Sequence, residues 1–280
     1  MRGDVITSRS NALVKHVRAV RDGKVTEQIF IEGMRLSEEI VISQRYRAAL
    51  AVEDVLYTEN FTRNERAADL INSLSGTSRR TTVVAEDVFV SISDTKSPQG
   101  VIVLAQRPRT DMETFEQRID GAQLIDPAPL VVMLHRINNP ANAGAMLRVA
   151  EAAGATGIIA TEGTTDLFSP KALRGAMGSS FRLPLWIGTT FDEALSWCVQ
   201  RAINTVSTDG RAAEAHTDID WTKPCAVVLG AEADGLSPDE LKATNARLSI
   251  PMRAPVESLN VAVALGIVLY EAARQRALAT

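Results

Sequence analysis

The sequence has only two cysteines, Cys198 and Cys225, among its 280 residues. Two thiols cannot build the disulfide framework of a small secreted protein, and no group of Cys and His residues has the spacing of a zinc site. The longest apolar run, 261–270, is well short of the ~20 residues that span a bilayer. The N-terminal segment also lacks the apolar stretch of a secretory signal. These absences predict a soluble cytoplasmic protein with no membrane segment and no metal.

The chain as a whole has no excess of basic residues, and its net charge is −4. The distribution is uneven, since residues 1–110 hold 16 Lys and Arg against 14 Asp and Glu, while the remainder holds 14 against 20. Within the first 24 residues six basic side chains face only Asp4 and Asp22. Such a segment can follow a phosphate backbone, and the competing interpretation is a solvated helix face.

The first hundred residues alternate helical and strand-like patterns. Apolar spacing predicts helices over 11–21, 35–43 and 64–73 and strands over 49–52, 55–57, 82–84 and 101–105. The pattern loosens after residue 106, where three prolines surround a polar stretch up to residue 129. We therefore expect a domain boundary there.

The second part of the chain contains short apolar runs with helical stretches between most of them. The runs cover 130–134, 157–161, 185–187, 203–206, 226–229 and 248–250. Their lengths suit strands that are covered on both faces, so an α/β domain with a mainly parallel sheet is predicted. In such domains ligands bind beyond the carboxyl ends of the strands.

The loop after the first of these strands, 135–144, leads into a helix that carries Arg148. Asn142 is expected to cap this helix, and Gly144 lets a ligand approach the backbone. A helix N-terminus attracts anions, and Arg148 in the second turn can reach the same space. The alternative is that Arg148 pairs with Glu151 three residues further on.

The loop 230–237 places an acidic pair between two glycines. It lacks the Gly-Lys-Ser/Thr ending of a phosphate-binding loop. Ser237 and Glu240 have the spacing of a capping box, with Pro238 at the first helical position.

The loop 250–260 precedes a stretch, 261–275, whose first half is apolar on nearly every side. A helix without a polar face must be buried in the core or against another subunit. Ser258 is the expected cap of this helix, with Asn260 beside it.

Taken in order, these segments resemble the SpoU (TrmH-like) branch of the SPOUT superfamily of RNA methyltransferases. The three family motifs are NNPANAGAMLRVAEAAGATGIIAT, VVLGAEADGLSPDEL and LSIPMRAPVESLNVAVALGIVLYEAARQR, and an intermediate element is SPKALRGAMGSSFRLP. Upstream, SRSNALVKHVRAVRDGK, FIEGMRLSEEI and SDTKSPQG resemble the ribosomal-protein-like RNA-binding domain of many members. The resemblance implies an RNA substrate-binding domain over 1–106, a linker over 107–128 and a methyltransferase domain with a deep trefoil knot over 129–280.

The resemblance further implies methylation of a ribose 2′-hydroxyl in RNA, with S-adenosylmethionine as cofactor and a homodimer as the working unit. Ribosomal RNA is favoured over transfer RNA as substrate. The residues that match the cofactor-binding positions are Thr208, Leu229, Gly230, Ile250, Pro251, Met252 and Leu259. The candidates for RNA contact are Arg9, Asn11, Lys15, Arg35, Lys171 and Arg174.

Arg148 matches the arginine of the first motif and is the leading catalytic candidate. A guanidinium is too basic for routine proton abstraction, so we expect it to stabilise negative charge on the ribose oxygen and to hold the adjacent phosphate. The other polar family positions are Asn142, Glu232, Ser258 and Asn260. Asn142 and Glu232 would order Arg148 and the ribose, and Ser258 and Asn260 would position the loop and substrate.

Two other classes of protein compete with this interpretation. One is a catalytically silent RNA-binding relative, against which the presence of the polar family positions argues. The other is a nucleotide-dependent oxidoreductase, but no Gly-x-Gly-x-x-Gly turn follows a predicted strand.

Overall fold

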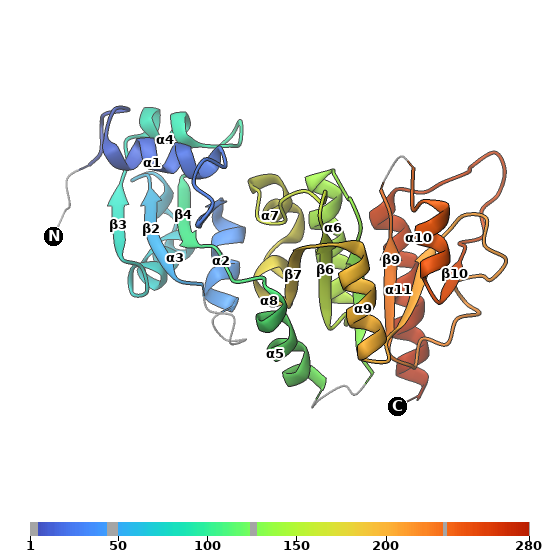
Figure 1. Cartoon of the computed structure of the whole chain (residues 1–280). Coiled ribbons are helices and arrows are strands. Elements are labelled where there is room, and N and C mark those ends of the chain that lie inside the picture. The colour runs from blue at the N-terminus through green and yellow to red at the C-terminus, as the bar shows by residue number, and fades with distance from the viewer. Residues whose placement is uncertain (1–4, 44–49, 124–127, 232–233, 280) are drawn as a thin grey trace. The chain divides into compact units, whose positions relative to one another are not determined.

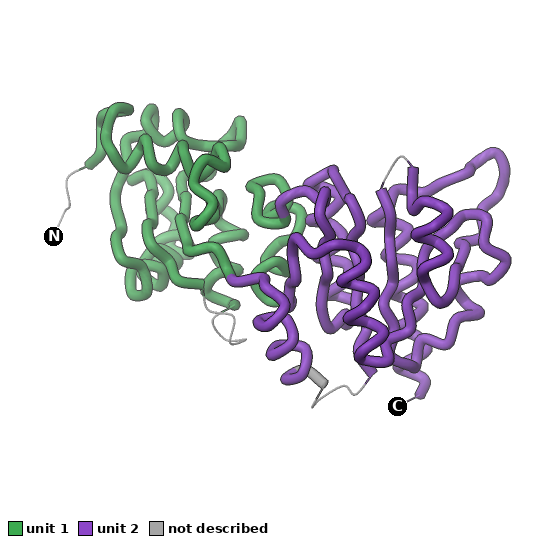
Figure 2. The backbone as a smooth tube through the Cα atoms, in the orientation of Figure 1, with its two compact units in different colours: residues 1–108, 167–182 green, residues 109–166, 183–280 purple. Residues whose placement is uncertain are grey.

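The computed structural model describes residues 5–43, 50–123, 128–231 and 234–279. The chain forms two compact units, shown in different colours in Figure 2. Unit 1 comprises Met1–Pro108 and Leu167–Arg182, and unit 2 comprises Arg109–Asp166 and Leu183–Thr280. The domain limits 1–106, 107–128 and 129–280 stay a prediction, and helix α5 (Met112–Gln123) lies within the predicted linker.

Unit 1 contains a four-stranded sheet with the order β1-β4-β2-β3. The strands are β1 (Gln28–Glu32), β2 (Val52–Tyr57), β3 (Arg80–Val83) and β4 (Val101–Gln106). Strand β4 pairs antiparallel with β1 and β2, whereas β2 and β3 are parallel. The two strands expected over 49–52 and 55–57 form one strand from Val52 onward, and residue 49 lies outside the described residues.

Amphipathic helices supply the rest of the core of unit 1. Helix α1 packs with α4 so that apolar side chains of both meet Phe30, Leu56 and Leu104 on one face of the sheet. Helices α2 and α3 contact each other and the strands β1, β2 and β4. The helices of this unit are α1 (Ala12–Arg21), α2 (Met34–Ser43), η2 (Phe61–Arg63), α3 (Glu65–Ser75), α4 (Glu86–Ile92), α7 (Pro170–Ala176) and α8 (Ser179–Arg182).

Unit 2 contains a six-stranded sheet with the order β10-β8-β9-β5-β6-β7. The strands are β5 (Leu130–Leu134), β6 (Gly157–Thr161), β7 (Leu185–Thr189), β8 (Asn204–Thr208), β9 (Cys225–Leu229) and β10 (Ala246–Leu248). Each neighbouring pair is parallel, so the predicted parallel sheet is confirmed. The strand expected over 248–250 instead ends at Leu248, which leaves Ile250 in the following loop.

Helices cover both faces of this sheet (Figure 1). Helix α5 and helix α9 (Phe191–Gln200) pack on one face, where Phe115, Trp186 and Trp197 form an aromatic cluster. Helix α6 (Pro140–Ala152) packs against α11 (Val261–Ala279), and the short α10 is Pro238–Ala243. Continuous apolar runs form the strands because both faces of a parallel sheet are buried.

Helix α11 buries one side and exposes the other. Leu265, Val268 and Leu269 are fully buried, whereas Val263 and Tyr270 are 53% and 58% exposed. We expected this helix to be buried on all sides. Within one chain, only part of its surface is buried. In the described part of the chain, no helix is both long and apolar enough to cross a membrane.

Arg276 fixes the C-terminal part of α11 to the beginning of the sheet. Its guanidinium donates to the carbonyl oxygens of Trp221 (2.8 Å), Lys223 (3.1 Å), Pro129 (3.5 Å) and Ala128. These carbonyls lie just before β5 and β9, at the opposite end of the sheet from the carboxyl ends of the strands. One side chain thus ties together three segments that are distant in the sequence.

We expect Arg276→Ala to lower the free energy of unfolding by about 2–4 kcal/mol, because it leaves several backbone carbonyls without their charged donor. Arg274→Ala is the matched control on the same helix, since Arg274 is exposed and, among the residues that the structure describes, pairs only with Glu271. The control should cost less than about 1 kcal/mol. Urea unfolding followed by tryptophan fluorescence measures both, and equal losses would contradict the anchoring role.

Candidate active site

A large cavity lies where the loops after β8, β9 and β10 meet the beginning of α11. Its volume is about 1340 Å³, and its walls come from segments 208–211, 229–231, 234–236, 247–252 and 256–261, together with Asn142, Pro238, Leu241, Lys242 and Ala264. It lies at the carboxyl ends of β8, β9 and β10, the end of a parallel sheet at which ligands bind. All the residues predicted to hold the cofactor line this cavity: Thr208, Leu229, Gly230, Ile250, Pro251, Met252 and Leu259.

The tight turn after β9 leaves room only for glycine at position 230. A Cβ atom on Gly230 would lie 2.4 Å from the carbonyl carbon of Gly235 and 2.5 Å from the backbone nitrogen of Leu236. The backbone nitrogen of Gly235 donates to the carbonyl oxygen of Ala231 at 2.8 Å, which closes the turn. Residues 234–236 therefore pack back onto the end of β9 and form part of the cavity wall.

Asn260 joins the loop before α11 to the first turn of α6. Its Nδ2 donates to Oδ1 of Asn142 at 3.1 Å, and its Oδ1 accepts from the backbone nitrogen of Ala262 at 3.0 Å. The expectation that Ser258 caps α11 is wrong, because Asn260 supplies the cap. Ser258, Asn260 and Asn142 all line the cavity.

Helix α6 begins three residues earlier than a cap at Asn142 would allow. Asn139 accepts from the backbone nitrogen of Ala141 at 2.9 Å and is the N-cap, with Pro140 in the first turn. Asn142 therefore lies inside the helix, and its expected capping role is wrong. This leaves its side chain for the contact with Asn260.

The remaining catalytic candidates, Arg148 and Glu232, stand apart from this group. Arg148 is exposed on α6 and is not among the residues that line the cavity. Within the described part of the chain it forms no ion pair, so the alternative pairing with Glu151 is not seen. Glu232 lies outside the described residues.

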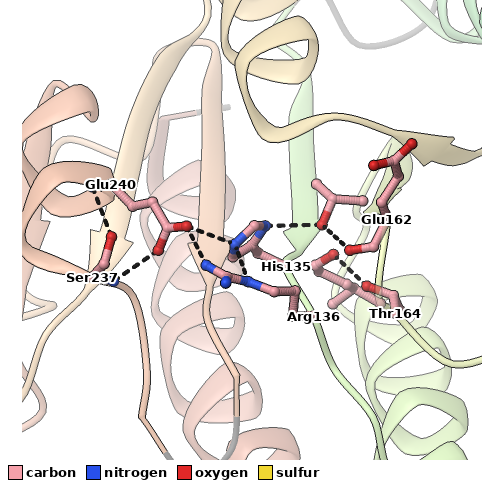
Figure 3. A network of polar contacts seen from close by, with 8 residues as sticks. His135, Arg136, Glu162, Thr164, Ser237 and Glu240 are labelled. Carbon is pink, nitrogen blue, oxygen red and sulfur yellow. Dashed lines mark hydrogen bonds and ion pairs between the residues drawn. The ribbon is translucent and has the colours of Figure 1, made fainter.

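A second polar group lies beyond β5, where the network in Figure 3 joins three segments. His135 is buried, with 5% of its surface exposed, and its Nδ1 lies 2.9 Å from Oγ1 of Thr161. Its Nε2 accepts from Nε of Arg136 at 2.6 Å and lies 3.0 Å from Glu240. Arg136 also donates to Glu240, whose other oxygen accepts from the backbone nitrogen of Ser237 at 2.7 Å.

The protonation states follow from these contacts. Burial lowers the pKa of His135, and the neighbouring Arg136 lowers it further against the opposing effect of Glu240. A neutral ring with its proton on Nδ1 lets Nε2 accept from Arg136. Burial would raise the pKa of Glu240, but the Ser237 hydrogen bonds and the positive charge of Arg136 lower it overall. Glu240 is thus the carboxylate that balances Arg136.

Sequence reasoning missed this network. The Ser237–Glu240 capping box is confirmed, but nothing in its pattern showed that Glu240 also binds Arg136, which is 104 positions away. Arg136 has a φ of 55°, a left-handed conformation that is uncommon outside glycine. The only available signal was that His135 and Arg136 directly follow a predicted strand.

The RNA-contact candidates lie in unit 1 with different surroundings. Lys15, Arg35 and Lys171 are exposed. Arg9 donates to the carbonyl oxygen of Asp87, Asn11 caps α1 through the backbone nitrogen of Leu13, and Arg174 lies 2.7 Å from Asp94 in an ion pair. Asn11 therefore has a structural role in addition to any contact with RNA.

The fold and the site define an α/β protein with a ligand cavity at the carboxyl ends of a parallel sheet. Residues 129–270 match the SpoU rRNA Methylase family, and residues 11–103 match the MRM3-like substrate binding domain. The chain belongs to the SpoU rRNA methylase family.

Similar proteins cover nearly the whole chain. An uncharacterized tRNA/rRNA methyltransferase of Synechocystis sp. is 32% identical over 97% of this chain and 94% of its own length. The 23S rRNA (guanosine-2′-O-)-methyltransferase RlmB of Ralstonia nicotianae is 30% identical over 84% of this chain and 93% of its own. The crystal structure of the SpoU methyltransferase AviRb from Streptomyces viridochromogenes, in complex with the cofactor AdoMet, matches with a TM-score of 0.80. It is 27% identical and covers 95% of this chain and 98% of its own.

Proposed function

We propose that this protein methylates ribose 2′-hydroxyl groups of ribosomal RNA with S-adenosylmethionine as methyl donor. The observation that carries the proposal is the single cavity that gathers all seven predicted cofactor residues with Asn142, Ser258 and Asn260. Membership of the SpoU family and the rRNA substrate in the name of RlmB support it. Transfer RNA is the alternative substrate, since the name of the Synechocystis relative covers both tRNA and rRNA. Work on ribosomal RNA would place the protein in the cytoplasm.

The cavity fits S-adenosylmethionine in chemistry. Ile250, Met252 and Leu259 offer apolar contact for an adenine ring, and the turn at Gly230 presents backbone groups that can bind polar atoms. When bound, this cofactor supplies a methyl group on a positively charged sulfur. Because the leaving group is already activated, the chain's residues must mainly place and activate the ribose oxygen.

Arg148 is the residue that we assign to the ribose oxygen. Its guanidinium stays charged at any physiological pH, so it stabilises the negative charge that develops on the oxygen rather than removing the proton as a base. The Asn142–Asn260 hydrogen bond fixes the first turn of α6 relative to the cavity wall. Ser258 and Asn260 then position the loop and the incoming ribose. Glu232, together with Asn142, would order Arg148 and the ribose.

The proposal also covers the knot and the RNA-binding residues. The cavity segments 229–237 and 248–260 belong to a knotted chain, as the SpoU resemblance implies. Lys15, Arg35 and Lys171 are exposed and available to contact RNA, together with Arg9, Asn11 and Arg174. These residues lie in unit 1, much of which matches a substrate binding domain.

The exposed side of α11 supports a homodimer. Val263, Ile267 and Tyr270 are spaced as one stripe along the helix and are 53%, 36% and 58% exposed. Exposed apolar stripes of this kind mark association surfaces, and a second copy offers the same stripe across a two-fold axis. Val256 and Leu259, at the cavity rim, are also exposed. The dimer would thus form beside the cavity. We propose that Arg148 contacts the ribose at this interface between the two copies.

We expect Gly230→Ala to weaken S-adenosylmethionine binding by at least about tenfold, because the added Cβ must push the 234–236 backbone out of position. Isothermal titration calorimetry measures the affinity, and circular dichroism checks that the fold is kept. Gly121→Ala is the control, since its Cβ meets nothing within 4 Å. Wild-type affinity in Gly230→Ala would contradict the cofactor assignment.

We expect Arg148→Ala to lower the rate of methyl transfer to unmodified 23S rRNA by at least about 10²-fold at saturating RNA, because a charge that stabilises the transition state is lost. Arg109→Ala, which removes an exposed arginine paired with Asp111, should keep the wild-type rate. Transfer of tritiated methyl groups to 23S rRNA and to tRNA measures the rate and distinguishes the two substrates. S-adenosylmethionine binding without transfer to either RNA would instead favour the silent relative.

We expect Tyr270→Glu to convert the dimer into a monomer, because a carboxylate placed in the apolar stripe would have to be buried without a partner. Analytical ultracentrifugation measures the mass. Val199→Glu is the control, because Val199 is 72% exposed on α9 and does not belong to α11. A monomeric wild-type protein at micromolar concentration would exclude this interface.

A further inference from the structure

A second, smaller cavity adjoins the first on the side of β5 and β6. Its volume is about 360 Å³, and it is lined by Arg136, Asn138, Gly163, Ala231, Asp234, Gly235 and Ser237. Ala231, Asp234 and Gly235 also line the large cavity, so the two cavities lie on opposite sides of the same turn. A ligand in the small cavity would therefore lie next to a cofactor in the large one.

The guanidinium of Arg136 is held in place at the edge of this small cavity. Its Nε donates to buried His135 at 2.6 Å, and Nη2 donates to Glu240. Gly163 packs so closely on the side-chain stem of Arg136 that a Cβ there would lie 3.1 Å from Cγ. Those two contacts use two of the five N–H donors, which leaves the others on a preorganised plane. The left-handed backbone at Arg136 is part of the same arrangement.

The charges of the small cavity argue against a phosphate as its ligand. Glu240 already balances Arg136, and Asp234 adds a carboxylate to the lining. A dianionic or monoanionic phosphate would meet this carboxylate with little positive charge left to compensate. The lining instead combines donors (Arg136, Asn138 and Ser237) with acceptors (Asp234 and Asn138) at close quarters. A planar, neutral group with its own donors and acceptors along one edge suits such a lining.

We propose that the small cavity receives the base of the nucleotide whose ribose is methylated. The inference rests on the proposed function, which requires a nucleotide next to the methyl donor. A base that leaves its stack is commonly read by hydrogen bonds along its Watson–Crick edge within a pocket. Asp234 accepts from ring or amino N–H groups of the base, Asn138 offers one donor and one acceptor, and Arg136 contributes its remaining N–H donors. These residues make the small cavity a determinant of which nucleotide is modified.

Two substitutions test the cavity. Asn138→Ala removes a residue that lines the small cavity but not the large one, so it should leave S-adenosylmethionine affinity within about twofold while weakening nucleotide binding about fivefold or more. Asp234→Asn replaces a pure acceptor with a group that also donates, and should change the order of preference among bases. Asp239→Ala is the matched control, since Asp239 is an exposed carboxylate that pairs with Lys242 on α10.

The experiment titrates GMP, AMP, UMP and CMP into the full-length protein saturated with S-adenosylhomocysteine, by calorimetry. The expected result is that wild type and Asp239→Ala bind at least one nucleotide with the same preference, while Asn138→Ala binds it more weakly and Asp234→Asn changes the preference. Failure of all four nucleotides to bind, or wild-type binding by both variants, would overturn the inference.

A parallel measurement of methyl transfer to unmodified 23S rRNA separates this inference from the proposed function. Nucleotide binding that depends on Asn138, in a protein that transfers no methyl group to any RNA, would remove the proposed function and keep the cavity as a base site. Normal methyl transfer with no effect of Asn138→Ala on KM for RNA would remove the base site and keep the proposed function.

Discussion

The close return of the 230–237 turn onto the end of β9 is the constraint on which the site depends. A Cβ at position 230 would lie 2.4 Å from Gly235 and 2.5 Å from Leu236, so these two residues pack directly against the end of β9. One side of it forms a wall of the large cavity, and the other side forms a wall of the small cavity. The capping box at Ser237 and the contacts of Glu240 with the loop after β5 hold the far end of the turn. The cofactor and the base of the proposed nucleotide would therefore be positioned by the same turn.

Much of the architecture could be predicted from the sequence because a parallel sheet has a simple signature. Strands buried on both faces read as short apolar runs, and the runs at 130–134 and 157–161 coincide with β5 and β6. The order of the strands and the pairing of β9 with β5 could not be read in this way, since periodicity carries no information on long-range neighbours. The likeness to a known family supplied what periodicity lacks.

The details of the site show where sequence reasoning stops. The family likeness selected seven residues that share one cavity, yet local rules assigned two helix caps wrongly. Asn139 and Asn142 are chemically identical as caps, and only the backbone path decides between them. The Asn142–Asn260 contact and the His135–Arg136–Glu240 network join residues more than a hundred positions apart. No spacing rule reaches that far.

Segment 167–182 interrupts unit 2 in the sequence and yet belongs to unit 1 in space. Arg174 pairs with Asp94, and Arg182 pairs with Glu39 at 21% side-chain exposure for the glutamate. The polypeptide therefore passes from one unit to the other three times. Recombination between related genes at a point near residue 108 would separate these charged partners. A hybrid that acquires a foreign N-terminal half would need a compatible 167–182 segment as well. The two segments are therefore expected to be exchanged together.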